Sequence, residues 1–188
     1  MEEEARVGLG GVPGVGAGRG HGEILTDPEG ARDSRFTSEV RCGVSDIPDL
    51  AAAQKVLAAQ PFSNLVGARL VSFGEGEATL ELDIRDDLRQ QYGFLHGGVL
   101  GYAADNALTF AAGAATHSRL ITAGFTIDYL RPAEGALLRA RARVVRAGRT
   151  RIVCRCDLSA VDDEGAESLC AVAQGTIAVL GPSDESGE

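Results

Sequence analysis

Two glycines and an aspartate, Gly97, Gly98 and Asp105, have the residue types and spacing that chemistry at a carbonyl group requires. If Gly97-Gly98 begins a helix, the first backbone N–H groups of that helix stay uncovered, because glycine has no side chain. These groups then lie at the positive end of the helix dipole and can donate to an oxygen that gains negative charge. Asp105 has the chemistry of a general base for water or of a nucleophile. The pattern predicts an oxyanion site and a reactive acid on one helix.

The separation of these groups predicts an oligomer. Gly97 and Asp105 are eight residues apart, which on an ideal helix is about 12 Å of rise and about 80° of rotation. One helix cannot bring both to a single small reacting centre. If both take part, the simplest geometry is a two-fold assembly in which the N–H of one subunit faces Asp105 of the other. Dimer and tetramer both fit this expectation.

The segment 99–115 predicts a helix that is buried nearly all round, because its residues are apolar or small on every side. Asp105, Asn106 and Thr109 are the main exceptions. An aspartate in such a helix loses hydration, which it must recover from hydrogen bonds, a charge partner or a raised pKa. Its alternative role is that of a structural acid bonded to buried backbone or to a histidine.

The elements around this helix have strand and turn signals. A helix is expected over 46–60, with Asp49 as N-cap, ending before Pro61. A hairpin follows, with strands over 65–73 and 77–84 joined by Gly74-Glu75-Gly76. Four more strands are expected after the buried helix, over 121–130, 136–146, 150–161 and 167–180. A long dry helix and a curved antiparallel sheet can bury each other, which predicts an α+β fold.

The motif around the two glycines resembles that of the hotdog-fold acyl-CoA thioesterases, specifically the phenylacetate-pathway-like (PaaI-like) branch of the 4-hydroxybenzoyl-CoA thioesterase superfamily. It reads Gln90, Gly93, His96-Gly97-Gly98 and Asp105. The resemblance covers about 50–180 and implies an oligomeric hotdog fold that hydrolyses an acyl- or aryl-CoA thioester to the free acid and CoA, without a metal or other cofactor. Gln90 departs from the pattern, because the branch usually has Asn at this position.

The resemblance also implies a set of site residues. The catalytic candidates are Asp105, Gly97, Gln90, His96 and Thr122. The substrate-binding candidates are Gly98, Gly124, Arg146 and Arg149, the last two flanking a turn where the family has basic residues near the phosphates of CoA.

Most of these residues have an ordinary alternative. Gln90 either donates its amide to the carbonyl or the water, or is a solvated loop residue. His96 either positions the thioester or braces the loop. Thr122 contacts Asp105 or its water, or is a strand threonine. The arginines bind phosphate or keep the surface soluble.

Composition limits the other possibilities. The 188 residues, 44% of them hydrophobic, suit one domain over 46–182, with disordered tails over 1–45, which is rich in glycine, and over 183–188. A formal net charge of -9 disfavours a nucleic-acid partner or an anionic membrane surface. The glycine run at 14–20 has Arg19 where a dinucleotide loop needs its third glycine, so a flexible linker is expected.

Cysteine and histidine usage indicates a reduced protein without a metal site. Cys42, Cys154, Cys156 and Cys170 form no CxxC pair and are expected as reduced core residues. His21 and His117 have no partners at metal-ligand spacing. With an acidic start and no long apolar span, the chain is expected to be cytoplasmic and not membrane-bound.

Two rival functions remain. The first is a non-catalytic acyl-CoA-binding or sensing protein on the same fold, with the glycine-rich tail as an interaction arm. The second is a hotdog dehydratase or hydratase. The sequence supports this function less well, because a resemblance to those enzymes would require a His before Phe-Pro or an Asp-to-His pair five residues apart, and neither occurs here.

Overall fold

The computed structural model describes residues 48–182. The two predicted tails, the glycine run at 14–20, His21 and Cys42 lie outside this range. The helices are α1 (Leu50–Ala58), α2 (Pro61–Val66), the short 3-10 helix η2 (Asp86–Leu88) and α3 (Gly97–Gly113). The strands are β1 (Arg69–Gly74), β2 (Glu77–Asp83), β3 (Ser118–Tyr129), β4 (Leu137–Ala147), β5 (Arg151–Val161) and β6 (Glu167–Pro182).

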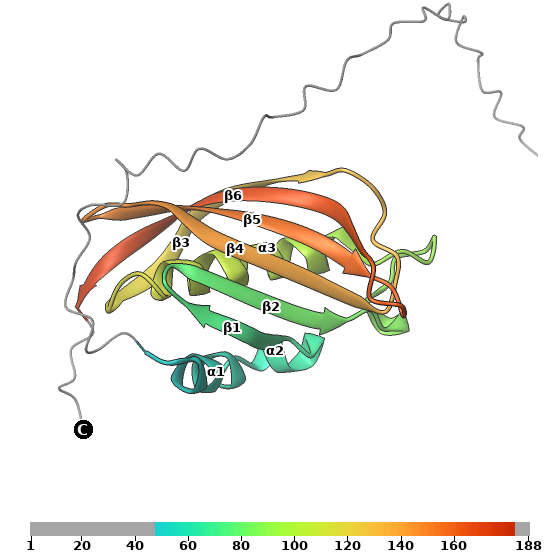
Figure 1. The fold of residues 1–188 in the computed structure, drawn as a ribbon, viewed down its shortest axis with the longest axis horizontal. Helices are drawn as coiled ribbons and strands as arrows, with labels where there is room; N and C mark the ends of the chain where they lie inside the picture. The colour runs from blue at the N-terminus through green and yellow to red at the C-terminus, as the bar shows by residue number, and fades with distance from the viewer. Residues whose placement is uncertain (1–47, 183–188) are drawn as a thin grey trace, which may run out of the picture. The chain divides into compact units, whose positions relative to one another are not determined.

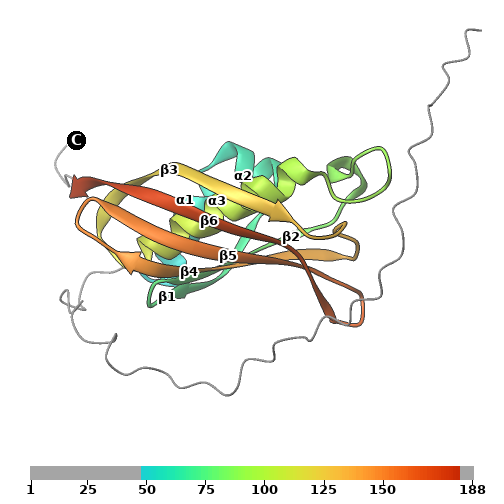
Figure 2. The same cartoon turned by 90° about the horizontal axis from the view of Figure 1, so that it is seen from above.

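The six strands form one antiparallel sheet in the order β1-β2-β4-β5-β6-β3. The sheet curves around α3 (Figures 1 and 2), and α1 packs against β1, where the Gln54 amide donates to the Leu70 carbonyl at 2.9 Å. This arrangement confirms the predicted hotdog fold. β1 and β3 are the edge strands, and β3 pairs with β6 on one side and with no described strand on the other.

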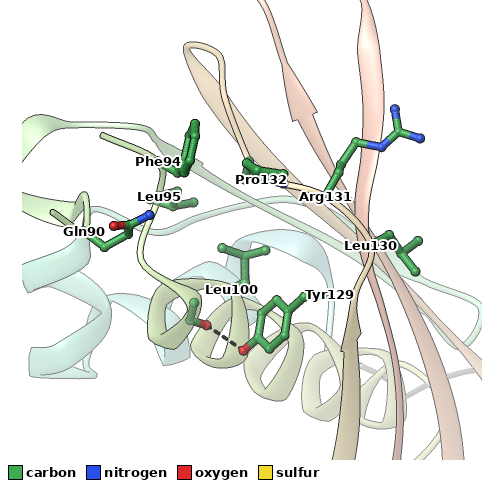
Figure 3. Close-up of a pocket in the computed structure, with 10 residues that line it drawn as sticks. Gln90, Phe94, Leu95, Leu100, Tyr129, Leu130, Arg131 and Pro132 are labelled. Carbon is green, nitrogen blue, oxygen red and sulfur yellow. Dashed lines mark hydrogen bonds between the residues drawn. The ribbon is translucent and has the colours of Figure 1, made fainter. Parts of the chain in front are cut away.

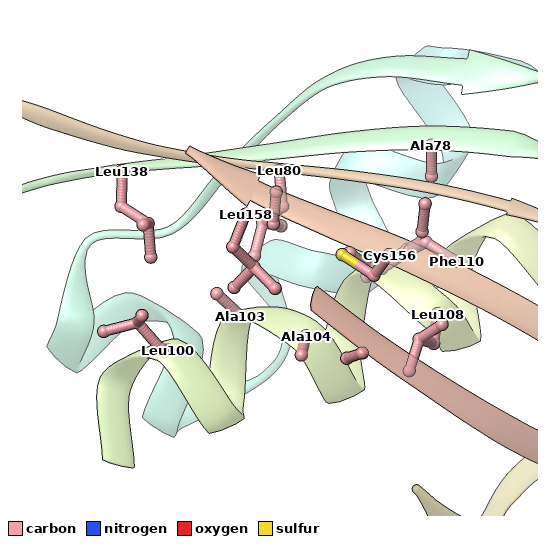
Figure 4. Close-up of a cluster of buried hydrophobic side chains, with 14 of the residues drawn as sticks. Ala78, Leu80, Leu100, Ala103, Ala104, Leu108, Phe110, Leu138, Cys156 and Leu158 are labelled. Carbon is pink, nitrogen blue, oxygen red and sulfur yellow. The ribbon is translucent and has the colours of Figure 1, made fainter. Parts of the chain in front are cut away.

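The core lies between α3 and the concave face of the sheet, where small residues of the helix meet larger residues of the strands (Figure 4). Ala103, Ala104 and Ala107 of α3 are at most 1% exposed, which lets the helix approach the strands closely. The residues of β2 alternate between the core and the opposite face, and Ala78, Leu80 and Leu82 are the buried ones. Alanines of α3 thus bring the helix backbone close to a sheet face of leucine, isoleucine, alanine and cysteine side chains.

The cysteines of the described residues belong to this core. Cys154, Cys156 and Cys170 are buried free thiols, as expected from the sequence. Burial raises the pKa of the Cys154 thiol to about 11 and, with a smaller contribution from Asp157, that of Cys156 to about 12. These groups stay protonated and have no nucleophilic role.

The expectation for α3 needs one correction. The helix is buried along the face toward the sheet, but Tyr102, Asp105, Asn106 and Thr109 are only half-buried. A single sheet covers only one side of a helix. The other flank is covered only in part, by α2, whose Ser63 hydroxyl accepts a hydrogen bond from the Tyr102 hydroxyl at 2.7 Å. The acid lies on this more open flank.

The N-terminal helices also differ from the prediction. Asp49 caps α1 as expected, accepting the N–H of Ala52 at 2.8 Å. Pro61, however, begins α2 at the first helical position, where its missing N–H costs no hydrogen bond. The first part of the strand expected over 65–73 is therefore helical, and β1 begins at Arg69. The other strand predictions are confirmed within three residues at each end.

The convex face of the sheet is charged. Arg139 pairs with Glu81, with its Nε 2.6 Å from Oε1, and also with Glu167. Arg141 binds both carboxylate oxygens of Glu167, at 2.5 and 2.7 Å. Hydrogen bonds from Arg141 and then Arg139 hold the pKa of Glu167 at about 2. Arg139 and Arg141 thus form an ion-pair network with two glutamates on this face.

Candidate active site

The start of α3 has one backbone donor that no other group within residues 48–182 uses. His96 is the N-cap, and its Nδ1 accepts the N–H of Gly98 at 2.9 Å. The N–H of Val99 donates to the His96 carbonyl at 2.9 Å. Among the described residues, the N–H of Gly97 has no acceptor. The helix start therefore presents the Gly97 N–H to a ligand oxygen, while His96 and Gly98 hold the turn in place.

A cavity of about 380 Å³ lies beside this donor (Figure 3). Gly97 and Gln90 both line it, together with Leu100, Tyr129 and Arg131. The hydroxyl of Tyr129 donates to the Gly97 carbonyl at 2.9 Å, and its ring lies 3.5 Å from where a Cβ at Gly97 would stand. The structure thus brings two predicted site residues together, and adds Tyr129, which sits 32 residues away and had no local sequence signal.

Arg89 holds the loop that carries Gln90. Its guanidinium donates to the Gly93 carbonyl at 2.7 Å, to the Ile84 carbonyl at 3.2 Å and to the Asp86 carboxylate at 3.1 Å. The side-chain oxygen of Gln90 accepts the N–H of Tyr92 at 2.6 Å, and its amide nitrogen faces the cavity (Figure 3). The Gln90 amide is therefore fixed as a donor toward the space beside Gly97.

Asp105 lies in a hydroxyl cluster farther along α3. Thr122 of β3 donates to Asp105 Oδ1 at 2.6 Å, and Thr109 Oγ1 lies 3.0 Å from Thr122 Oγ1. The contact expected between Thr122 and Asp105 is present. Asp105 Oδ2 has no hydrogen-bond partner among the described residues. One carboxylate oxygen is thus fixed by a hydroxyl, and the other is left for a water or a substrate.

Thr109 was missed as a site residue, although the sequence contained a signal for it. It follows Asp105 by four residues on the same helix, a spacing that places two side chains on one face. Its half-buried hydroxyl belongs to the same cluster as the acid. Thr109 therefore extends the acid site along α3.

The remaining predicted residues lie apart from Gly97 within one subunit. Arg146 and Arg149 are exposed at the β4–β5 hairpin. That hairpin is near the C-terminal end of α3, because Val144 and Ala114 are both hydrogen-bonded to Gly76. Gly124 lies at a bulge in β3, beside a separate hollow with Arg151. A single subunit thus holds the oxyanion donor and these three residues at different places.

Residues 48–182 contain neither a cluster of metal ligands nor a membrane-spanning helix. No group of three or more His, Cys, Asp or Glu side chains within residues 48–182 could hold a metal ion. In the same range, no helix has the length and apolar character that crossing a membrane requires.

Comparison with known proteins identifies the family. The model of the thioesterase superfamily matches residues 92–167, which include Gly97, Asp105 and Thr122 but not Gln90. A solved structure of a thioesterase family protein from Silicibacter pomeroyi is 32% identical, with a TM-score of 0.65 over 68% of this chain and 94% of that chain. The chain belongs to the thioesterase superfamily.

Other thioesterase superfamily relatives have more specific names. A 1,4-dihydroxy-2-naphthoyl-CoA hydrolase of Listeria monocytogenes is 28% identical over 116 residues, which are 61% of this chain and 91% of that protein. The phenylacetic acid degradation protein PaaI from Thermus thermophilus is 26% identical, with a TM-score of 0.57 over 64% of this chain and all of that chain. Membership of the superfamily supports thioester hydrolysis as the reaction.

Proposed function

We propose that this protein is an acyl-CoA thioesterase of the PaaI-like branch. The observation that carries the proposal is the pair of unused groups on α3, the Gly97 N–H and Asp105 Oδ2, in a chain of the thioesterase superfamily. A thiolate leaves a thioester readily, so one base and one oxyanion donor suffice for hydrolysis. The naphthoyl-CoA hydrolase among its relatives makes aryl-CoA thioesters the first substrates to try.

The active site would be shared between two subunits. Ile121, Phe125 and Tyr129 on the free edge strand β3 are each more than a third exposed, which is unusual for large apolar side chains on a stable edge. We infer that β3 pairs antiparallel with β3 of a second copy about a two-fold axis near its middle. Tyr129 and Gly97 of one subunit then lie opposite Thr122 and Asp105 of the other.

Catalysis would proceed at this shared centre. The Gly97 N–H donates a hydrogen bond to the thioester carbonyl oxygen, and Asp105 of the partner removes a proton from water as the water oxygen attacks the carbonyl carbon. The C–S bond then breaks, and the proton passes to the departing CoA thiolate. In the alternative route, Asp105 attacks directly and water hydrolyses the resulting anhydride. Trapping of an acyl-enzyme by hydroxylamine would distinguish the two routes.

The other site residues would serve this reaction from both subunits. Gln90 adds a second donor to the carbonyl or the water, because its amide nitrogen faces the cavity beside Gly97. His96 and Gly98 keep the helix start rigid through their hydrogen bond. Thr122 orients Asp105. Arg146, Arg149 and the bulge at Gly124 would contact the CoA arm across the interface. Three buried free thiols support a reducing, cytoplasmic setting.

The direct test is thiol release from a panel of aryl, short and long acyl-CoA thioesters, with Asp105→Ala measured beside the wild type. The proposal expects turnover of at least one class by the wild type and none by the variant. If neither releases thiol while both are stabilised by acyl-CoA, the protein binds thioesters without cleaving them and the enzyme proposal fails.

A further inference from the structure

Tyr129 reaches from the end of β3 to the first turn of α3 (Figure 3). Besides its hydrogen bond to the Gly97 carbonyl, its hydroxyl oxygen lies 3.5 Å from where a Cβ at Gly97 would stand and 4.0 Å from where one at Gly101 would stand. Gly97 and Gly101 are four residues apart, which places them on the same face of the helix. The phenol end of Tyr129 therefore rests on helix backbone that two glycines leave bare.

The sheet anchors the backbone from which this side chain extends. Tyr129 is in register with Ala171 of β6. The N–H groups of Leu130 and Arg131 both donate to the Cys170 carbonyl, at 2.9 and 3.3 Å. Cys170 and Ala171 are fully buried. The ring of Tyr129 thus reaches α3 from a fixed point of the sheet.

The contact restrains the backbone on both sides of the Gly97 Cα. The peptide unit between Gly97 and Gly98 is held at its carbonyl by Tyr129 and at its N–H by Nδ1 of His96. The preceding peptide unit is held at its carbonyl by the N–H of Val99, and its own N–H is the oxyanion donor. These two planar units meet at a glycine, whose φ and ψ have the fewest steric limits. Tyr129 therefore supplies, from a distant strand, a restraint that the glycine itself lacks.

From these contacts we infer that Tyr129 is a positioning residue, which sets the direction of the Gly97 N–H. This inference rests on the proposed thioesterase function and adds a residue to it. A donor stabilises an oxyanion well only when it is aimed at the oxygen before the charge develops. Thr122, on the same strand, holds the acid through a hydroxyl in a similar way. β3 thus positions both reactive groups of α3.

The first test is Tyr129→Phe, which keeps the ring and removes the hydrogen bond. With the acyl-CoA thioester that the wild type cleaves fastest, kcat should fall about two- to tenfold, the range for a neutral hydrogen bond, while KM stays the same. Tyr92→Phe is the matched control, because it removes a hydroxyl from an exposed tyrosine of the neighbouring loop and should leave kcat unchanged. A loss of less than about twofold in Tyr129→Phe overturns the inference.

A double variant shows whether the effect passes through the oxyanion donor. Gly97→Pro removes the N–H at the first helical position, where a helix tolerates proline. If Tyr129 acts by aiming this N–H, adding Tyr129→Phe to Gly97→Pro should cause no further loss of kcat. A loss of the same size with and without the N–H would place the role of Tyr129 elsewhere and overturn the inference.

A measurement without turnover keeps the inference testable and separates its failure from that of the proposed function. If the wild type cleaves no thioester, the proposed function fails. The restraint is then measured by NMR, as it is if Gly97→Pro does not fold. Tyr129→Phe should lower the order parameter of the Gly97 N–H and leave that of Ala107, in the middle of α3, at its wild-type value. An unchanged value at Gly97 overturns the inference.

Discussion

The two functional ends of α3 use different parts of the polypeptide. At its start, the group presented is a backbone N–H, and the residues around it, His96, Tyr129 and Arg89, only hold the chain in place. Two turns later, the group presented is a side chain, and Thr122 and Thr109 orient it. A backbone donor survives most substitutions, whereas a carboxylate is lost with one. The two ends should therefore differ in which substitutions abolish activity.

The largest effect is expected at the side-chain end. Asp105→Asn keeps the shape and the hydrogen bond with Thr122 but removes the base. Turnover should fall at least about a hundredfold, which is the usual scale of base catalysis. The melting temperature should change little, because Asp105 is half-buried. Steady-state thiol release and thermal melts measure both, and activity within about threefold of the wild type would remove Asp105 from the mechanism.

The backbone end can be probed with a matched pair at Gly97. Gly97→Pro removes the N–H at the first helical position, where proline is tolerated, and His96 already has the extended conformation that proline requires before it. Turnover should fall about 10²- to 10³-fold. Gly97→Ala keeps the N–H, and its Cβ would make an ordinary 3.5 Å contact with Tyr129. Equal losses in the two variants would assign the effect to crowding rather than to the donor.

A smaller effect is expected from the hydroxyl that orients the acid. Thr122→Val has nearly the same shape and removes the 2.6 Å hydrogen bond to Asp105 Oδ1. Because a hydrogen bond to a charged group contributes about 1.5–3 kcal/mol, kcat should fall about tenfold or more. Thr122→Ser should restore most of it. Loss of activity in both variants would show that the hydroxyl alone does not account for the role of Thr122, and full activity in Thr122→Val would remove the hydroxyl from the mechanism.

The smallest effect is expected on the convex face, which has no part in the proposed reaction. The pKa of Glu167 is lowered in the folded state, so its contribution to stability is complete above its ordinary value of 4.5 and is lost as pH falls to about 2. Glu167→Gln should cost about 1 kcal/mol or less at pH 7, because solvent screens this network. Thermal melts between pH 7 and pH 2 should show the melting temperatures of the wild type and of Glu167→Gln converging as the pH falls. The kcat of Glu167→Gln at pH 7 should equal that of the wild type.

Much of this arrangement could be predicted from the sequence. Apolar alternation located the strands within three residues at each end, apart from the N-terminal part of β1, and Asp49 marked the start of α1. Gly97 and Asp105 were found because their chemistry depends on local spacing along one helix. The first helix was predicted to end before Pro61, and α1 does end before it, but α2 was missed because the same proline also begins the next helix. The side chain of Tyr129 and the half-burial of Asp105 depend on long-range packing, which local patterns do not contain.

The central claim is that one active site combines Gly97 of one subunit with Asp105 of another, and subunit mixing tests it most directly. Gly97→Pro and Asp105→Ala should each be inactive alone. After denaturation together and refolding, random pairing makes half the pairs mixed, and each mixed pair has one intact site of its two. Thiol release should recover to about a quarter of the wild-type rate. A mixture that folds and assembles but stays as inactive as its parents would contradict the shared site.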